Sequence, residues 1–231
     1  MAVYDRKLYP IDIVDLSEDL LDPLSRAFSR WWEGGVDVLL GLACIKEAFR
    51  QRCLSAGADM ACRIAMLKAD RRMVGFCLSV PQPKMNQSSA LVTHALALRH
   101  LKWRIWTSPR LWRYVNRFLV RRIKARFFGR GGKEQMSAFA AQDGLLDGKT
   151  EYVAQLIVDA DYRFGNIGFD LMLDMEEQAR RRSARRVCGL VNRNNIRAQR
   201  VYAAVGWKRT SPGDTNHDHF MMHKDLEVLP E

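Results

Sequence analysis

Several features are missing from this 231-residue chain, and each absence excludes a class of protein. No stretch is apolar over the roughly 18 to 20 residues that a membrane-spanning helix needs. The N-terminus lacks the apolar core of a signal peptide. The five cysteines are scattered, and no two form a C-x-x-C pair. We therefore expect a cytoplasmic protein with reduced thiols, not a disulfide scaffold or a zinc site.

Acidic residues are missing from one long segment. From Arg71 to Lys133 the chain has 15 lysines and arginines and no aspartate or glutamate, whereas the net charge of the whole chain is +11. The remainder of the chain is therefore slightly acidic. A segment of one charge sign this long indicates either a solvated surface or a specific anionic partner.

The two common glycine-rich nucleotide motifs, G-x-G-x-x-G and G-x-x-x-x-G-K-[ST], are also absent. What is present is an apolar run at 152–158, a glycine-containing turn at 161–168 and a helical pattern that begins at Phe169. Such a strand–turn–helix unit can hold a phosphate group on backbone N–H groups at the positive end of the helix dipole. We expect Gly165, Asn166 and Gly168 to allow close approach and unusual backbone angles there.

Two motifs in this part of the chain resemble those of the GNAT superfamily of acyl-CoA-dependent N-acetyltransferases. The pyrophosphate loop of that family, roughly [QR]-x-x-G-x-[GA], is matched by residues 163–168, with Asn166 in place of a middle glycine. The second motif, N-x-x-A-x-x-x-Y-x-x-x-G-[FW], is complete as Asn195, Ala198, Tyr202, Gly206 and Trp207. The resemblance extends from residue 151 to residue 226.

The resemblance implies a site as well as an activity. Acetyl-CoA would be the co-substrate, and a backbone N–H near Val158 would polarise the thioester carbonyl. Tyr202 would be the general acid that protonates the leaving thiolate, a role that suits a phenol because its pKa of about 10 lies near that of a thiol. The cofactor-binding residues would be Leu156, Ile157, Val158, Arg163, Phe164, Gly165, Asn166, Ile167, Gly168, Asn195 and Ala198.

Three candidate site residues, Tyr202, Asn195 and Glu151, also have ordinary structural interpretations. Tyr202 could be a packing residue on an amphipathic helix, and Asn195 could cap that helix, alone or in addition to a cofactor contact. Glu151, at the start of the central strand, could act as general base through an ordered water or could be a solvated strand end. We expect no metal site, although His217, His219 and His223 would share one side of the last strand.

The expected fold is a single α/β (α+β) domain over 1–231, with a GNAT-type twisted mixed sheet that is splayed near Val158. Strands are predicted at 7–14, 62–68, 73–80, 152–158, 186–191, 208–210 and 219–226. Helices are predicted after Ser17, where Pro23 breaks or restarts the first one, and over 36–53. Residues 81–150 are predicted to be a basic insertion of two helices between the third and fourth strands.

The basic segment between Arg99 and Arg130 has three interpretations, because Trp103, Trp106 and Trp112 lie among its cations. It could be a solvated helix pair that covers the sheet, a dock for an anionic membrane surface, or a landing site for an anionic substrate. We expect a cytoplasmic enzyme, either free or peripheral to the inner face of the membrane, and a homodimer is an open alternative.

For the reaction we expect direct acetyl transfer to a small primary amine, with an amino sugar as one candidate acceptor. The alternatives are acetylation of a protein amine or aminoacyl-tRNA, and a non-catalytic CoA-binding module.

Overall fold

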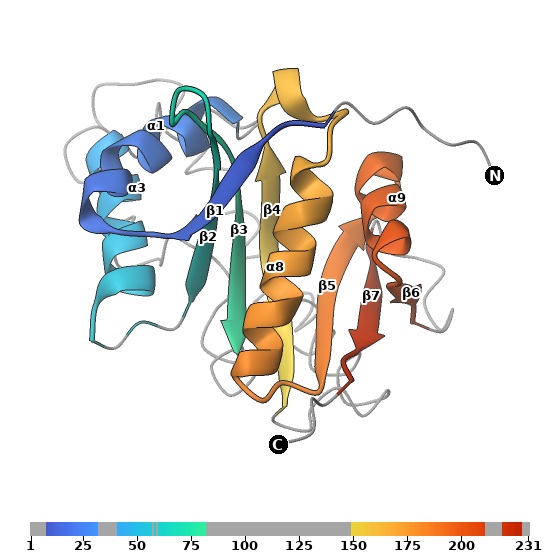
Figure 1. Cartoon of the computed structure of the whole chain (residues 1–231). Helices are drawn as coiled ribbons and strands as arrows, with labels where there is room; N and C mark the ends of the chain where they lie inside the picture. Colours follow the sequence, from blue (N-terminus) through green and yellow to red (C-terminus); the bar gives the residue numbers. More distant parts are fainter. Residues whose placement is uncertain are drawn as a thin grey trace, which may run out of the picture.

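The computed structural model describes residues 8–31, 41–56, 58, 60–81, 149–210 and 219–227. These residues form one seven-stranded sheet in the order β1-β2-β3-β4-β5-β7-β6 (Figure 1). Only the β4–β5 pair is parallel, so the predicted twisted mixed sheet is confirmed. The strands are β1 (Ile11–Asp15), β2 (Ala61–Leu67), β3 (Met73–Pro81), β4 (Thr150–Val158), β5 (Arg186–Asn192), β6 (Lys208–Arg209) and β7 (His219–Asp225).

Helices cover both faces of this sheet. On one face lie η1 (Glu18–Leu20), α1 (Leu21–Trp31), α3 (Leu42–Phe49) and its continuation η2 (Arg50–Leu54). On the other lie α8 (Ile167–Arg181) and α9 (Ile196–Ala204), as Figure 1 shows. A short turn of helix, η3 (Ala160–Tyr162), links β4 to α8.

Strand β3 is central to the core because both of its faces are buried. Phe76, Leu78 and Val80 belong to the apolar cluster under α1 and α3, whereas Val74 and Cys77 belong to the cluster under α8. Residues 76, 78 and 80 follow the two-residue period of a strand, and Val74 falls on the opposite face because the register between β2 and β3 shifts beside it. On the α1 side the Phe76 ring is within 6.3 Å, between ring centres, of three other aromatic rings: Phe28, Trp31 and Phe49. Full burial of each such ring contributes about 1.5–3 kcal/mol to folding.

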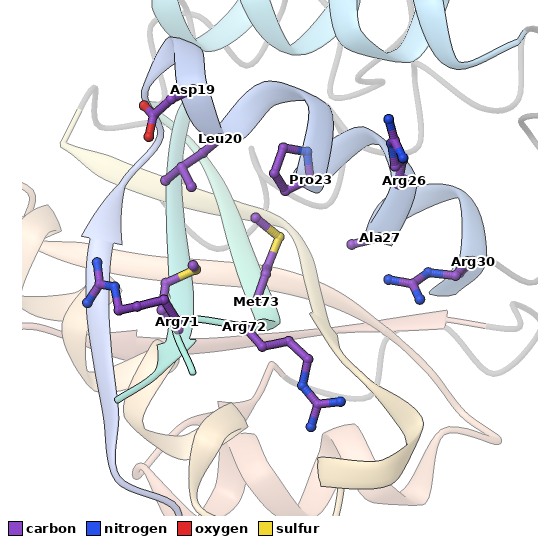
Figure 2. A pocket seen from close by; sticks show the side chains of 10 residues that line it. Asp19, Leu20, Pro23, Arg26, Ala27, Arg30, Arg71, Arg72 and Met73 are labelled. Atoms are coloured by element: carbon purple, nitrogen blue, oxygen red, sulfur yellow. The ribbon is translucent and has the colours of Figure 1, made fainter. Parts of the chain in front are cut away.

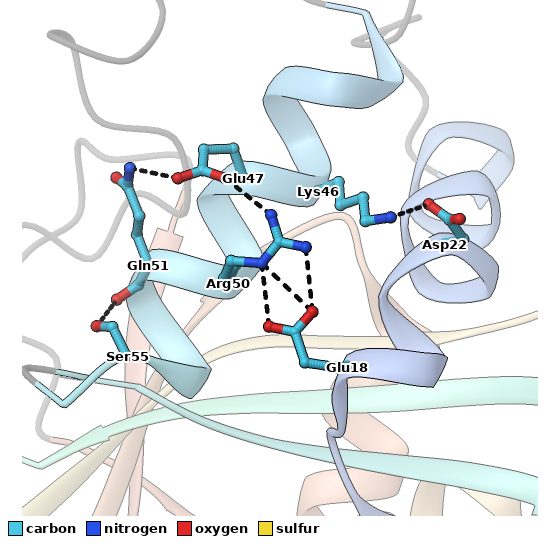
Figure 3. Close-up of polar contacts among 7 residues, drawn as sticks. All are labelled: Glu18, Asp22, Lys46, Glu47, Arg50, Gln51 and Ser55. Carbon is cyan, nitrogen blue, oxygen red and sulfur yellow. Dashed lines mark hydrogen bonds and ion pairs between the residues drawn. The ribbon is translucent and has the colours of Figure 1, made fainter.

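Ion pairs join the first two helices at the surface, as Figure 3 shows. Arg50 binds Glu18 through Nε and Nη2, both at 3.0 Å, and also reaches Glu47 at 3.1 Å. Lys46 pairs with Asp22 at 2.7 Å. Exposed pairs of this kind contribute little individually, but the two-pronged contact of Arg50 fixes the direction in which α1 and α3 cross.

Most predicted elements are found close to their expected bounds. Pro23 lies in the first turn of α1, directly after η1, so the helix restarts there as expected. Helix α8 begins at Ile167, two residues before the predicted Phe169. Residues 36–40 of the predicted second helix and residues 82–148 of the predicted insertion, with the segment between Arg99 and Arg130, lie outside the described residues.

Candidate active site

The parallel strands β4 and β5 are paired at one end only. Their register runs from Thr150 opposite Arg186 to Tyr152 opposite Cys188 and stops there. Beyond that point β4 remains paired with β3 and β5 remains paired with β7, so the two strands diverge. Along 153–158 the backbone groups of β4 that face β5 have no strand partner among the described residues. The predicted splaying of the sheet is confirmed.

A β-bulge lies at the point where the strands diverge. Leu78 of β3 is opposite Gln155, but Ser79 is opposite Val153, so Ala154 is an extra residue in β4. A bulge bends its strand and leaves a residue out of the ladder, which exposes more of the β4 backbone. In the same place the side-chain oxygen of Gln155 is buried and has no hydrogen-bond partner within the described part of the chain. A buried polar atom of this kind is normally satisfied by a donor.

The glycine-containing turn follows directly from the open end of β4. Asp159 accepts a hydrogen bond from the N–H of Asp161 at 3.2 Å, and Arg163 Nε donates to the carbonyl of Val158 at 3.0 Å. The N–H of Gly165 donates to Tyr162 at 3.1 Å, and Ile167 then begins a 15-residue helix. The start of α8 has no side-chain cap from Asn166, so the turn leads from the open end of β4 to the positive end of a helix dipole, where an anion is favoured.

The expected left-handed backbone of this turn is wrong. Asn166 has right-handed angles, φ −77° and ψ −16°, and neither Gly165 nor Gly168 has a positive φ. The reason is that the turn passes from η3 almost directly into α8, and both have right-handed angles. A Cβ at Gly168 would make only ordinary van der Waals contacts, 3.6 Å from Val158 and 3.9 Å from Val201, so neither backbone angle nor space requires a glycine there.

Asn166 uses its side chain to hold the N-terminal segment against the turn. Its Oδ1 accepts a 2.8 Å hydrogen bond from the N–H of Tyr9, and its amide donates to the Tyr9 carbonyl at 3.3 Å and to Asp170. The ring of Tyr9 packs edge-on against Tyr162, with ring centres 4.9 Å apart. The contact of Tyr9 with the turn could not be predicted from the sequence, because the segment before β1 contains no motif. An asparagine in this position therefore has a structural reason.

The start of α9 forms the other side of the mouth. Asn195 caps this helix by accepting a 3.1 Å hydrogen bond from the N–H of Ala198, so the capping interpretation is confirmed. The guanidinium of Arg197 lies 4.6 Å from the ring centre of Phe164, which is 74% exposed. An exposed ring stacked by a cation is a suitable surface for a base and its phosphates.

Tyr202 is buried on the α8 side of the sheet and packs against the ring of Trp207, 5.0 Å between ring centres. The spacing of the two residues follows from the way α9 ends. Trp207 N–H donates to the Tyr202 carbonyl at 2.9 Å, Gly206 N–H donates to Ala203 at 3.0 Å, and Gly206 has φ +87°. This is a Schellman cap with its usual apolar contact. The Y-x-x-x-G-W spacing is thus a helix end that fixes the tyrosine ring.

A buried carboxylate holds this helix end in place. Glu176 of α8 is 1% exposed and accepts hydrogen bonds from Trp207 Nε1 at 2.8 Å and from Lys224 Nζ at 2.6 Å. Lys224 also donates to the carbonyl of Val205 at 2.8 Å. Helix α8, the end of α9 and strand β7 therefore meet at one carboxylate. Sequence reasoning missed Glu176, because a glutamate within a helix pattern is typical of a solvated face.

Burial, with the nearby Cys77 and Tyr152 as smaller causes, raises the pKa of Tyr202 well above its usual range. The phenol is therefore neutral and carries its proton at physiological pH. Burial also raises the pKa of Tyr152, the last residue of β4 that pairs with β5, to about 12. Both phenols are accordingly uncharged at physiological pH.

Glu151 lies at the paired end of β4, far from the turn. Its side chain is almost fully buried, accepts a hydrogen bond from Ser79 Oγ and forms a salt bridge with Arg182, Nε to Oε2 3.0 Å. The interpretation as a solvated strand end is wrong, because the last turn of α8 covers this position. Seven residues of strand, about 23 Å, separate Glu151 from Val158. This geometry favours a structural role.

The histidines at the end of the chain give no sign of a metal centre. Within the described ranges no group of three histidine, cysteine or acidic side chains is placed to hold an ion. His223 lies with Nδ1 2.8 Å from the hydroxyl of Thr210. His217 lies outside the described residues.

Comparison with known proteins agrees with this geometry. The model of the acetyltransferase (GNAT) family matches residues 6–207. The chain belongs to this family. It is therefore an enzyme of the acyl-CoA-dependent N-acyltransferase type, as the resemblance predicted. No curated protein sequence matches the chain.

Solved structures of GNAT proteins share the fold at low sequence identity. The PaiA N-acetyltransferase of Thermoplasma acidophilum, solved with coenzyme A, is 13% identical over 94% of this chain and 99% of its own, with a TM-score of 0.51. A ribosomal-protein-alanine N-acetyltransferase of Brucella melitensis is 12% identical over 93% of this chain and 99% of its own, with a TM-score of 0.52. An aminoglycoside 6′-acetyltransferase type Ii is 14% identical over 95% of this chain and 99% of its own, with a TM-score of 0.51.

None of the helices in the described ranges is long and apolar enough to cross a bilayer.

Proposed function

We propose that this protein transfers the acetyl group of acetyl-CoA directly to a primary amine of a small molecule, within a complex of enzyme and both substrates. The observation that carries the proposal is the opening between β4 and β5. It begins at the Ala154 bulge, is flanked by Tyr202 and leads to the turn at the start of α8.

The residues around the opening fit the parts of acetyl-CoA. Backbone N–H groups of residues 163–168 would receive the pyrophosphate, helped by the α8 dipole. The free edge of β4 at Leu156, Ile157 and Val158 would bond the amide groups of the pantetheine arm in the way a strand would. Asn195 and Ala198, at the start of α9, would border the arm on the β5 side.

The chemistry needs no covalent enzyme intermediate. The amine nitrogen attacks the thioester carbonyl, the C–N bond forms, and the C–S bond breaks to release the thiolate of CoA. A backbone N–H near Val158 would stabilise the oxyanion. The thiolate takes the phenol proton of Tyr202, and the proton lost by the amine restores the phenol through solvent.

Burial changes what Tyr202 contributes to this step. A pKa above the usual 10 keeps the phenol protonated, but it makes complete proton transfer to a thiolate, with a pKa of about 8.5, less favourable than a balanced pair would be. We infer that the main effect of Tyr202 is a hydrogen bond to sulfur that strengthens as negative charge develops there. Because Trp207 and Glu176 hold the helix end, this hydroxyl is pre-positioned.

For the acceptor, an amino sugar is our first candidate, and the similarity to an aminoglycoside acetyltransferase supports it. The similarity to a ribosomal-protein-alanine acetyltransferase supports a protein amine as the second candidate. Among the described residues around the opening we identify no general base, and Glu151 is engaged by Arg182.

Substitution of Tyr202 by phenylalanine tests the proposal. We expect kcat to fall about 10²- to 10⁴-fold, because one acid is removed, while the affinity for CoA stays unchanged. Release of free thiol with a panel of small amines, amino sugars, peptides and aminoacyl-tRNA would measure kcat and name the acceptor class. Tyr162→Phe is the control, since it removes a phenol hydroxyl near the turn but outside the opening.

Two results would overturn this proposal in different ways. If Tyr202→Phe keeps full kcat, the phenol has no role in the reaction. If the unaltered protein binds CoA but releases no thiol with any amine, it is a binding module.

A further inference from the structure

A second cavity, of about 480 Å³, lies on the other face of the sheet, between α1 and the turn that joins β2 to β3 (Figure 2). Its floor is apolar and includes Ala27, Met66 and Met73, each less than a tenth exposed. Leu20 and Pro23 complete the apolar lining. A volume of this size is in the range that holds a small organic ligand.

Four arginines surround this apolar floor. Arg26 and Arg30 come from α1, and Arg71 and Arg72 come from the β2–β3 turn, with Met73 between the two pairs in Figure 2. The single acidic residue of the lining is Asp19, which hydrogen-bonds Ser17. The lining therefore carries four cations and one carboxylate around an apolar centre, and Arg72 is paired with Asp70 beside the lining at 3.7 Å.

The arginines of α1 have little compensation within the part of the chain that the structure describes: the pKa of Asp22 is lowered by its hydrogen bond from Lys46 and, to a smaller extent, by the charge of Arg26. Arg26 and Arg30 are one helical turn apart, an arrangement of like charges that costs an isolated helix a few tenths of a kcal/mol. Neither forms a salt bridge or a hydrogen bond there, whereas Arg71 pairs with Asp12 at 2.9 Å. Two cations that form no salt bridge within the described residues, beside an apolar cavity, suit an anion with an apolar body.

The cavity adjoins the turn of the proposed acetyl-CoA site without sharing its residues. The guanidinium of Arg72 contacts the hydroxyl of Tyr162 and lies 5.1 Å from the centre of its ring. Tyr162 belongs to η3, directly before the turn at 163–168, but neither it nor any cavity residue is among the predicted cofactor contacts. A ligand here would thus occupy a site of its own.

We propose that this cavity binds a small organic anion, a carboxylate or phosphate monoester with an apolar body. The apolar part lies on Ala27, Met66 and Met73, and the anionic group is held by Arg30 and Arg26. This site is additional to the proposed acetyltransferase function and does not depend on it.

Calorimetric titration of the full chain with phenyl phosphate, in the presence of saturating CoA, tests the proposal. CoA occupies any site that recognises its own phosphates, so the remaining binding reports the second cavity. Inorganic phosphate supplies the charge alone and benzyl alcohol the ring alone. We expect phenyl phosphate to bind in a one-to-one ratio, inorganic phosphate to bind more weakly and benzyl alcohol not to bind.

Substitutions locate the binding. Arg30→Ala and Arg26→Ala should each weaken phenyl phosphate about tenfold, which is the worth of one charge-assisted hydrogen bond. Arg181→Ala, an exposed arginine at the far end of α8, removes the same charge elsewhere and should change nothing. The proposal is overturned if phenyl phosphate does not bind at millimolar concentration, if CoA abolishes its binding, or if the three variants behave alike.

Discussion

The two ends of strand β4 differ in how they are held. At Glu151 and Tyr152 the strand is paired on both sides, and Glu151 is closed in by Ser79 and Arg182. At Leu156–Val158 the strand is paired only with β3, and its free edge leads to the turn before α8. Side-chain charges hold the first end together, whereas backbone groups are left open at the second. One strand of nine residues therefore has one end held by side-chain charges and another end whose edge is unpaired among the described residues.

The same contrast explains which charged residues are structural. Glu151 and Glu176 are both nearly fully buried, and both are paired with cations from neighbouring elements. Burial of a carboxylate is costly without such partners. Changes at the closed end should therefore lower stability and leave chemistry intact, and changes at the open end should do the reverse.

The largest stability effect is expected for Arg182→Ala at the closed end. It leaves Glu151 buried without its cation, which should lower the free energy of unfolding by about 3 kcal/mol. Urea unfolding measures this. Arg181→Ala is the matched control, because its pair with Glu177 is exposed and should contribute about 0.5 kcal/mol or less.

The Arg182→Ala variant also tests the assignment of Glu151. Under conditions where the variant is folded, its kcat should equal that of the unaltered enzyme. Equal stability of the two arginine variants would show that the closed end is not held by this pair. If Glu151→Gln were fully stable but lost most of its kcat, Glu151 would be the general base after all.

A smaller effect is expected at the end of α9, beside the open end. Gly206→Ala forces a side chain into φ +87°, which costs about 1–2 kcal/mol, although there is room for the Cβ 3.8 Å from Lys224. Unlike Arg182→Ala, this change should also lower kcat, because the Schellman cap sets the position of Tyr202. Gly189→Ala is the comparison, since its φ is not positive, although its Cβ would meet a carbonyl at 3.4 Å. A variant that loses stability but keeps full kcat would separate the cap from the chemistry.

The sequence predicted the open end better than the closed one. The turn at 163–168 and the motif from Asn195 to Trp207 lie in contiguous segments, so their spacing could be read directly. The partners of Glu151 come from positions 79 and 182, and the partner of Asn166 comes from position 9. Such contacts depend on register and on how α8 crosses the sheet, which no local pattern encodes.

The role of Tyr202 shows a related limit. Its spacing to Gly206 and Trp207 predicted its position, but the same spacing is also what a helix end requires. Sequence alone could not show that its pKa is raised by burial, because the burying residues come from α8, β4 and β7.

A further prediction concerns the tether at the open end. Asn166→Ala removes both hydrogen bonds to Tyr9 and should raise the KM for acetyl-CoA about tenfold, because the turn is no longer held while the catalytic phenol is untouched. Steady-state kinetics measure it, with kcat expected to change little. Asn166→Asp is the control, since it keeps the acceptor for the Tyr9 N–H but loses the donor and adds a negative charge beside the phosphates. If the alanine variant binds acetyl-CoA as the unaltered enzyme does, the N-terminal segment has no part in the site.

The smallest expected effect lies at the boundary between the two ends of β4. There Tyr152 is the last residue of β4 that pairs with β5. Its pKa is raised by burial to about 12 in the folded chain, against about 10 when unfolded. The neutral phenol therefore supports stability fully below pH 10, and this contribution is lost as the pH rises from 10 to 12. Between pH 8 and pH 10 the free energy of unfolding should fall in both proteins, and the fall should be a few tenths of a kcal/mol smaller for Tyr152→Phe than for the unaltered chain. Urea unfolding at pH 6, 8 and 10 measures the difference, which should be constant between the first two; a constant difference at all three would mean that Tyr152 is accessible to water at the point where the strands diverge.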